Sequence, residues 1–353
     1  MSSLHSRIPY RKPPNQCPVC ETYQEHRRQF RFIQNYKQNS DQWSLFECPF
    51  CFVQFWHPFS YPGRKYYENV DFYYERDAIG VGSLNAQQKF FLKQYRPRPF
   101  EAVRLLDIGC GSGEFIHEVK KRLGWEVWGI DINRNVIDTV KKKYHIEHVY
   151  AIPFEMLPND ARFSDFDIVT AFEVIEHIGN PAQFIAVARR ILKKRGVLVI
   201  STPNRRRLIG RHTISDFPPV HLTRWDMKSL PRAVSGRGFD TQQINEVEFS
   251  LSFFTYNLFA PGNFFNPLSF RIGKKIIRYA LGNGNKNDLS DTAFPAHRRL
   301  SRRTLFLIAA IQWIAKCKQL ALGISFGLPL WTYTLCVKPK RSCLVAFFKN
   351  NDA

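Results

Sequence analysis

Strand-like and helix-like segments alternate from Val103 to Ser201, and this alternation constrains the fold more than any other feature of the 353-residue chain. Such a pattern is typical of a mostly parallel sheet with helices on both faces. The sequence therefore predicts an α/β, doubly wound domain. The expected strands are Val103–Ile108, Glu126–Ile130, His148–Ile152, Phe166–Ala171 and Val197–Ser201, and the expected helices are Glu114–Leu123, Arg134–Tyr144 and Pro181–Lys193.

The stretch "LLDIGCGSGEF" (105–115) joins the first expected strand to the first helix. Three glycines at every second position leave the backbone free of Cβ atoms, and the helix behind them offers unpaired N–H groups to a ligand. A tight turn without a ligand and a dinucleotide site are the competing interpretations. The dinucleotide fingerprint is GxGxxG, whereas here the spacing is two and two and an aspartate precedes the first glycine.

Two aspartates at neighbouring strand ends narrow the choice of ligand. Asp107 would repel a phosphate at the loop but suits the ammonium of an amino-acid moiety. Asp131 ends the second expected strand, where an acid can accept hydrogen bonds from both hydroxyls of a ribose. An amino acid joined to a ribose indicates S-adenosylmethionine (SAM).

The N-terminal part carries two cysteine pairs, "CPVC" (17–20) and "CPFC" (48–51), among eight cysteines. The N-terminus has no apolar run of the secretory kind, which favours a reducing cytoplasm over an exported disulfide scaffold. Two CxxC pairs can surround one tetrahedral zinc ion, and a short polar segment needs such a staple. Four reduced cysteines and a redox pair are the alternatives. The expected structural zinc ligands are Cys17, Cys20, Cys48 and Cys51.

The segments "LLDIGCGSGEF", "VWGIDIN", "FDIVTAFEVIEHIGNP" and "GVLVISTPN" resemble successive motifs of class I SAM-dependent methyltransferases. With the CxxC pairs and the aromatic segment after them, the chain is similar to bacterial methyltransferases that carry an N-terminal zinc ribbon and modify small molecules or polysaccharides. The resemblance implies a Rossmann-like, seven-stranded, mostly parallel sheet with a helical insertion before the last strand. It also implies a cofactor site made of Asp107, Gly109, Cys110, Gly111, Gly113, Asp131 and Ile132, with Phe172 as a further contact. Many relatives carry an acidic residue beside the adenine after the third strand, whereas this sequence reads "YAIPFEMLP" (150–158), and Phe154 and Glu155 are the expected adenine contacts instead.

"FEVIEH" (172–177) follows the fourth expected strand. On one helical turn its two glutamates and its histidine would share a face and converge on a cation such as Mg²⁺. The segment resembles the ExxEH metal motif of ubiquinone-biosynthesis O-methyltransferases and of small-RNA 2′-O-methyltransferases, in which a downstream histidine completes the site. That resemblance implies a second metal held by Glu173, Glu176, His177 and His221. In metal-free relatives the glutamate lines the cofactor pocket, and His177 or His221 would then be the catalytic base.

The expected domains are a zinc-ribbon-like module (1–60), an aromatic linker (61–100), a SAM-binding core (101–250), a basic insertion (251–328) and the last core strand with the tail (329–353). The linker's aromatic residues suit packing better than base stacking. "LWTYTLCVKPK" (330–340) is the expected seventh strand. From Leu251 onward, 15 Lys and Arg face 3 Asp and Glu. The apolar run in the insertion is too short to span a bilayer, so a substrate lid or a membrane-surface helix are the two interpretations.

These observations predict a cytoplasmic enzyme, peripheral to a membrane if the insertion binds lipid. It would transfer a methyl group from SAM to an oxygen of a small-molecule, glycan or lipid-linked acceptor. The net charge of +21 also suits phosphates. An RNA 2′-O-methyltransferase and a non-catalytic binding module are therefore the alternative functions.

Overall fold

The computed structural model describes residues 14–24, 29–38, 40–69, 84–95, 102–207, 216–247 and 343–351. The chain divides into two compact units, Met1–Phe249 with Lys340–Ala353, and Ser250–Pro339. All described residues belong to the first unit. The expected insertion (251–328) lies outside them.

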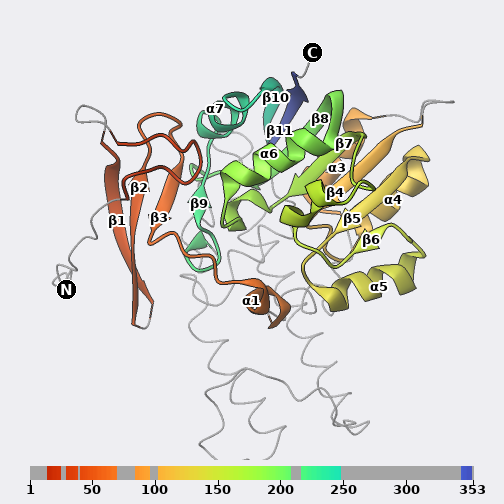
Figure 1. The fold of residues 1–353 in the computed structure, drawn as a ribbon, viewed down its shortest axis with the longest axis horizontal. Coiled ribbons are helices and arrows are strands. Elements are labelled where there is room, and N and C mark those ends of the chain that lie inside the picture. The colour runs from red at the N-terminus through yellow and green to blue at the C-terminus, as the bar shows by residue number, and fades with distance from the viewer. Residues whose placement is uncertain are drawn as a thin grey trace, which may run out of the picture. The chain divides into compact units, whose positions relative to one another are not determined.

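The larger sheet has seven strands in the order β10-β11-β8-β7-β4-β5-β6 (Figure 1). Strands β4 to β8 run parallel to one another, and β11 is antiparallel to both of its neighbours. This order, with one reversed strand near an edge, is the class I methyltransferase sheet that the sequence predicted. The strands are β4 (Arg104–Ile108), β5 (Glu126–Ile130), β6 (Val149–Tyr150), β7 (Phe166–Phe172), β8 (Leu192–Pro203), β10 (Phe239–Val247) and β11 (Cys343–Asn350).

Helices cover both faces of this sheet because successive strand residues point to opposite sides. Leu105 belongs to the apolar cluster under the helices α3, α4 and α5, and the next residue, Leu106, belongs to the cluster under η1, α6 and α7. The helices are α3 (Ala86–Gln94), α4 (Glu114–Leu123), α5 (Arg134–Tyr144), η1 (Phe154–Asn159), η2 (Ile175–His177), α6 (Pro181–Ile191) and α7 (Ser229–Ser235), and α1 (Arg64–Asn69) precedes them.

The smaller sheet has four strands in the order β1-β2-β3-β9, all antiparallel. Three of them come from the N-terminal module: β1 (Arg31–Gln38), β2 (Asp41–Glu47) and β3 (Gln54–His57). The fourth, β9 (Thr223–Arg224), belongs to the chain between β8 and α7. The module and the larger domain therefore share a sheet, which the sequence did not predict.

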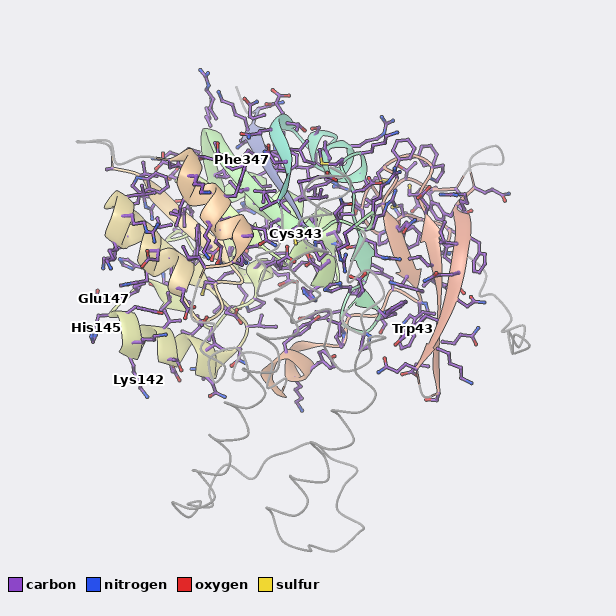
Figure 2. All side chains as sticks on the ribbon, turned by 180° about the vertical axis from the view of Figure 1, so that it is seen from behind. Trp43, Lys142, His145, Glu147, Cys343 and Phe347 are labelled. Carbon is purple, nitrogen blue, oxygen red and sulfur yellow. The ribbon has the colours of Figure 1, made fainter. Side chains whose placement is uncertain are left out.

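The predicted position of the last core strand was wrong. The strand that pairs with β8 is β11, "CLVAFFKN" (343–350), and not the stretch 330–340, which lies outside the described residues. Seven of the eight residues of β11 are buried, as expected for a strand inside a sheet; Cys343 and Phe347 are labelled in Figure 2. The two apolar runs are separated only by "KPKRS" (338–342), so composition alone did not distinguish them.

Candidate functional site

The glycine loop follows β4 and has the bare backbone that the sequence predicted. Gly109, Gly111 and Gly113 all have positive φ angles, of 75°, 50° and 78°. A Cβ atom on Gly109 would lie 2.6 Å from Val174, and one on Gly113 would lie 2.7 Å from Val140. Both the backbone conformation and the close packing therefore require glycine at these two positions. The N–H groups of Gly109 and Cys110 donate to the Ile130 carbonyl, which ties the loop to the end of β5.

Asp131, directly after β5, lies beside this loop. Its carboxylate accepts hydrogen bonds from the N–H groups of Gly111 (3.1 Å) and Asn133 (2.9 Å), and only 5% of the residue is exposed. Burial raises the pKa of Asp131, and the backbone hydrogen bonds, which lower it, only partly oppose this effect. The next residue, Ile132, is half-buried. The acid and the glycine loop thus meet at the carboxyl edge of the sheet, where open α/β folds bind ligands.

Asp107 is buried inside β4. It accepts a hydrogen bond from the Thr170 hydroxyl at 2.6 Å. Burial raises its pKa to about 7, and the hydrogen bond from Thr170 only partly opposes this. A cationic group near the loop would favour the ionised carboxylate.

The predicted adenine contacts, Phe154 and Glu155, and the further cofactor contact, Phe172, have different environments. The ring of Phe154 packs edge-on against Phe184 at 5.4 Å, and that of Phe172 packs against Phe115 at 4.8 Å. Both rings are buried in the apolar clusters of the sheet. Glu155 is exposed at the start of η1. Its charge raises the pKa of Tyr61, after the larger effect of burial and together with Asp131, so Tyr61 lies near both acids.

Glu176, His177 and His221 form a second group, whose ligand atoms all lie within 4.8 Å of one another. His177 Nε2 lies 3.9 Å from Glu176 Oε1, and the two imidazole rings are 4.7 Å apart. Glu176 is 1% exposed, and both its carboxylate oxygens lack a hydrogen-bond partner. Burial, together with the charges of Glu173 and Asp216, raises the pKa of Glu176 well above its usual range.

Glu173 is not part of this group. It has a positive φ angle of 57° and precedes the short helix η2, so the helical turn expected over Glu173–His177 does not form. Its carboxylate instead bonds to the Ser201 hydroxyl (3.1 Å) and the Gln87 amide (3.2 Å). Burial raises its pKa to about 7. Spacing alone placed three side chains on one face, whereas the left-handed residue turns the first of them away.

Both histidines are oriented by the acceptors at their Nδ1 atoms. His177 Nδ1 lies 2.8 Å from the Val220 carbonyl, and His221 Nδ1 lies 3.2 Å from the Asp216 carboxylate. A carbonyl only accepts, so His177 Nδ1 carries the proton and its Nε2 lone pair is exposed toward Glu176. Burial, reinforced by His221, lowers the pKa of His177 to about 3, so this ring is neutral at pH 7. Such outer hydrogen bonds are the usual support of histidines that bind metals.

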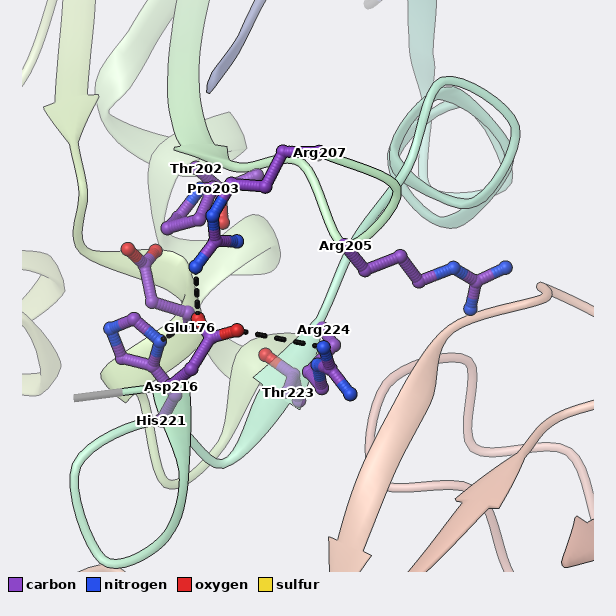
Figure 3. A pocket seen from close by; sticks show the side chains of 9 residues that line it. All are labelled: Glu176, Thr202, Pro203, Arg205, Arg207, Asp216, His221, Thr223 and Arg224. Carbon is purple, nitrogen blue, oxygen red and sulfur yellow. Dashed lines mark hydrogen bonds and ion pairs between the residues drawn. The ribbon is translucent and has the colours of Figure 1, made fainter. Parts of the chain in front are cut away.

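The residues around this group include several that sequence reasoning missed. A small cavity beside Glu176 is lined by Thr202, Pro203, Arg205, Arg207, Asp216, His221, Thr223 and Arg224 (Figure 3). Asp216 accepts from Arg207 at 2.6 Å and lies 3.5 Å from Arg224. Although burial raises the pKa of Asp216, the hydrogen bond from His221 and the two arginine charges outweigh it and hold the pKa well below its usual range. The basic run "NRRR" (204–207) is the signal in the sequence that could have indicated this group.

The four N-terminal cysteines converge as predicted. The sulfurs of Cys17 and Cys51 are 3.8 Å apart, and those of Cys20 and Cys48 are 3.7 Å apart. Tetrahedral zinc with Zn–S bonds of about 2.3 Å requires sulfurs about 3.8 Å apart. The residue two positions after the first cysteine of each pair also donates its backbone N–H toward that cysteine's sulfur, at 3.5 and 3.4 Å. The four thiolates are therefore compatible with one zinc ion.

The sheet order and the positive-φ glycine loop are those of the class I methyltransferase fold. Residues 84–244 match the family model described as "Methyltransferase domain".

Curated relatives include ubiquinone biosynthesis O-methyltransferases. That of Cereibacter sphaeroides is 39% identical over 140 residues, covering 38% of this chain and 53% of the relative, and that of Maricaulis maris is 34% identical over 113 residues, covering 31% and 43%. The chain thus spans about half the length of the curated relatives it matches.

Similar solved structures have lower identity. A SAM-dependent methyltransferase from Archaeoglobus fulgidus has a TM-score of 0.43 and 18% identity, covering 80% of this chain and 100% of that one. A methyltransferase bound to the Trm112 activator from Haloferax volcanii has a TM-score of 0.43 and 16% identity, covering 53% and 80%. Among the described residues, no helix combines the length and the apolar character needed to cross a membrane.

Proposed function

We propose that this protein transfers a methyl group from SAM to a hydroxyl oxygen of a small-molecule, glycan or lipid-linked acceptor. The observation that carries the proposal is the meeting of two groups at the carboxyl edge of one sheet. The glycine loop with Asp131 follows β4 and β5, and Glu176 with His177 follows β7. A cofactor and an acceptor hydroxyl bound at these two places would be neighbours. The O-methyltransferase relatives support oxygen as the accepting atom.

In this proposal the first group binds the cofactor. The bare loop backbone admits its methionine part, and ionised Asp107 favours the ammonium there. Asp131 accepts from the ribose hydroxyls. The sulfonium is a good leaving group, so holding the acceptor oxygen in line with the methyl carbon can supply much of the rate. The C–S bond breaks as the O–C bond forms, which gives S-adenosylhomocysteine and the methyl ether, and the hydroxyl proton passes to water.

The second group fits a divalent cation held by Glu176, His177 and His221. One carboxylate and two imidazoles are suitable ligands, and two unsatisfied buried oxygens need a positive partner. A bound cation would supply Lewis acidity that favours the deprotonated hydroxyl. The low pKa of His177 makes it a weak proton acceptor but keeps its Nε2 free of protons. This supports a ligand role for His177 over that of a general base.

The test is calorimetric titration of SAM and S-adenosylhomocysteine into the purified protein, its Asp131→Ala variant and a control, Asp138→Ala, which alters an exposed aspartate on α5. A hydrogen bond to a charged group contributes about 1.5–3 kcal/mol, so losing two should weaken binding by roughly 100-fold or more. The control should bind as the unchanged protein does. A well-folded protein that binds neither compound would overturn the proposal.

The acceptor class is tested separately, by assaying methyl transfer to phenols, catechols and sugars with Mg²⁺ or Mn²⁺ at several salt concentrations. A hydroxyl acceptor of low charge should be methylated at a rate nearly independent of salt. Transfer to RNA with a steep salt dependence would instead indicate the 2′-O alternative.

A further inference from the structure

One short loop supplies most of the surroundings of the histidine pair. The segment 216–222 contains His221, the Asp216 carboxylate that accepts from His221, and the Val220 carbonyl that accepts from His177. Both Nδ1 acceptors and His221 itself therefore belong to this one loop. Whatever holds the loop also sets the geometry of the site.

The N-terminal ribbon holds one side of the loop. Phe217 stacks on Tyr36 of β1, with ring centroids 4.4 Å apart and an interplanar angle of 22°, and its ring lies 5.7 Å from that of Trp56. The backbone N–H of Trp56 donates to the Leu222 carbonyl at 3.0 Å. The residues that follow, Thr223–Arg224, form the edge strand of the ribbon's own sheet.

The other side of the loop is bonded to the short helix that carries the remaining ligand candidates. The Leu222 N–H donates to the Glu176 carbonyl at 2.8 Å, and the Thr223 hydroxyl donates to the Ile175 carbonyl at 3.4 Å. Leu222 is fully buried and uses its N–H toward η2 and its carbonyl toward β3. The loop is thus a bridge between the ribbon and η2.

Arginines of the methyltransferase domain also donate to carbonyls in the cysteine turns. Arg205 donates to the Phe52 carbonyl at 2.7 Å, and Arg237 donates to the Val19 carbonyl at 2.9 Å. Val19 lies between two of the zinc-ligand candidates, and Phe52 follows the last of them. The folded cysteine turns are therefore joined directly to the domain that carries the site.

We infer that the ribbon is a positioning element of the histidine site: through the contact of Tyr36 with Phe217 it holds the loop that places His221 and orients His177. A ribbon that only recruited a partner would not need to share a strand and an aromatic contact with this loop. The effect on cation affinity rests on the proposed function, whereas the effect on imidazole orientation does not.

The test compares Tyr36→Ala and Phe217→Ala with two matched variants. Tyr36→Phe keeps the stacking ring, and Phe32→Ala removes a half-exposed ring of β1 that lies instead against Phe46. Each protein is assayed for zinc content, for S-adenosylhomocysteine binding, for Mn²⁺ affinity by electron paramagnetic resonance, and for the imidazole ¹⁵N signals of His177 and His221. Zinc content and cofactor binding report whether the ribbon and the domain remain folded.

We expect Tyr36→Ala and Phe217→Ala to weaken Mn²⁺ binding by roughly 10- to 100-fold, the range seen when an outer partner of a metal ligand is lost. Their His177 and His221 signals should lose the pattern of a ring protonated at Nδ1, while Tyr36→Phe and Phe32→Ala keep it. If Tyr36→Ala loses its zinc, Phe217→Ala decides the matter, since this residue lies outside the ribbon. Unchanged imidazole signals in Phe217→Ala would overturn the inference. A parent protein that binds no Mn²⁺ would overturn only the cation proposal, and the imidazole signals would still decide this one.

Discussion

Replacement of Asp107 by asparagine should make the protein's stability less dependent on pH. The carboxyl is buried, and its pKa rises from 3.8 to about 7 in the ligand-free fold. That difference corresponds to about 4 kcal/mol of free energy favouring the protonated folded state. Asparagine resembles the protonated acid and can still accept the hydrogen bond from Thr170.

The sign follows from the number of protons bound in each state. Between pH 4 and 7 the folded protein keeps the Asp107 proton and the unfolded chain has lost it, so raising the pH destabilises the fold by about 1.4 kcal/mol per pH unit. Above pH 7 both states are ionised and the loss stays constant. The unfolding free energy of Asp107→Asn relative to the parent should therefore rise by up to about 4 kcal/mol from pH 4 to 7 and then level off.

Urea unfolding of the two proteins, followed at intervals from pH 4.5 to 8.5, measures this difference directly. Other titrating groups affect both proteins alike and cancel in the comparison. A constant difference across this range would refute the assignment of a raised pKa to Asp107. Saturating S-adenosylhomocysteine provides a second check, because its ammonium should stabilise the carboxylate and reduce the pH dependence of the parent.

Three further substitutions test other parts of the molecule. Gly113→Ala would place a Cβ 2.7 Å from Val140 at a φ of 78°, and we expect it to lower the unfolding free energy by about 2–5 kcal/mol, measured by urea unfolding. Glu176→Gln should abolish Mn²⁺ binding without lowering the zinc content or the unfolding free energy. Retained Mn²⁺ affinity would exclude Glu176 as a ligand. Arg205→Ala removes one partner of the buried Asp226, which keeps Arg206 and two backbone N–H donors, and should cost about 1.5–3 kcal/mol, again measured by urea unfolding; a change below about 0.5 kcal/mol would contradict this account.

The parallel core was predictable from sequence because its signals are local. The boundaries of α4, α5 and β5 agree with the structure to the residue, since a glycine or an asparagine at each start and a basic last turn mark the helices. The predicted strand His148–Ile152 shrank to Val149–Tyr150, because this edge strand pairs on one side only. Helix α6 ends at Ile191, two residues before the predicted end at Lys193, because β8 begins at Leu192.

The candidate site was less predictable because its parts come from distant segments. The glycines and Asp131 were predictable because they follow the ends of predicted strands. The cysteine pairs were predictable from their spacing. The roles of Asp216 and Val220 depend on a loop that joins two sheets, and no periodic pattern encodes such a junction. Glu173 lies outside the histidine group because its own backbone is left-handed. The sequence gives no sign of this conformation, since the residue is not a glycine.

The state of Glu176 links these parts. A carboxylate that is 1% exposed and accepts no hydrogen bond is stable only with a proton or a cation beside it. When no cation is bound, burial favours the protonated form of Glu176 and raises its pKa. A proton on Glu176 does not explain why the two neighbouring imidazoles are oriented, yet each donates from its Nδ1 atom to an outer acceptor. A cation uses all three groups at once, so the arrangement of the loop, the ribbon and η2 is explained by a cation better than by a protonated acid alone.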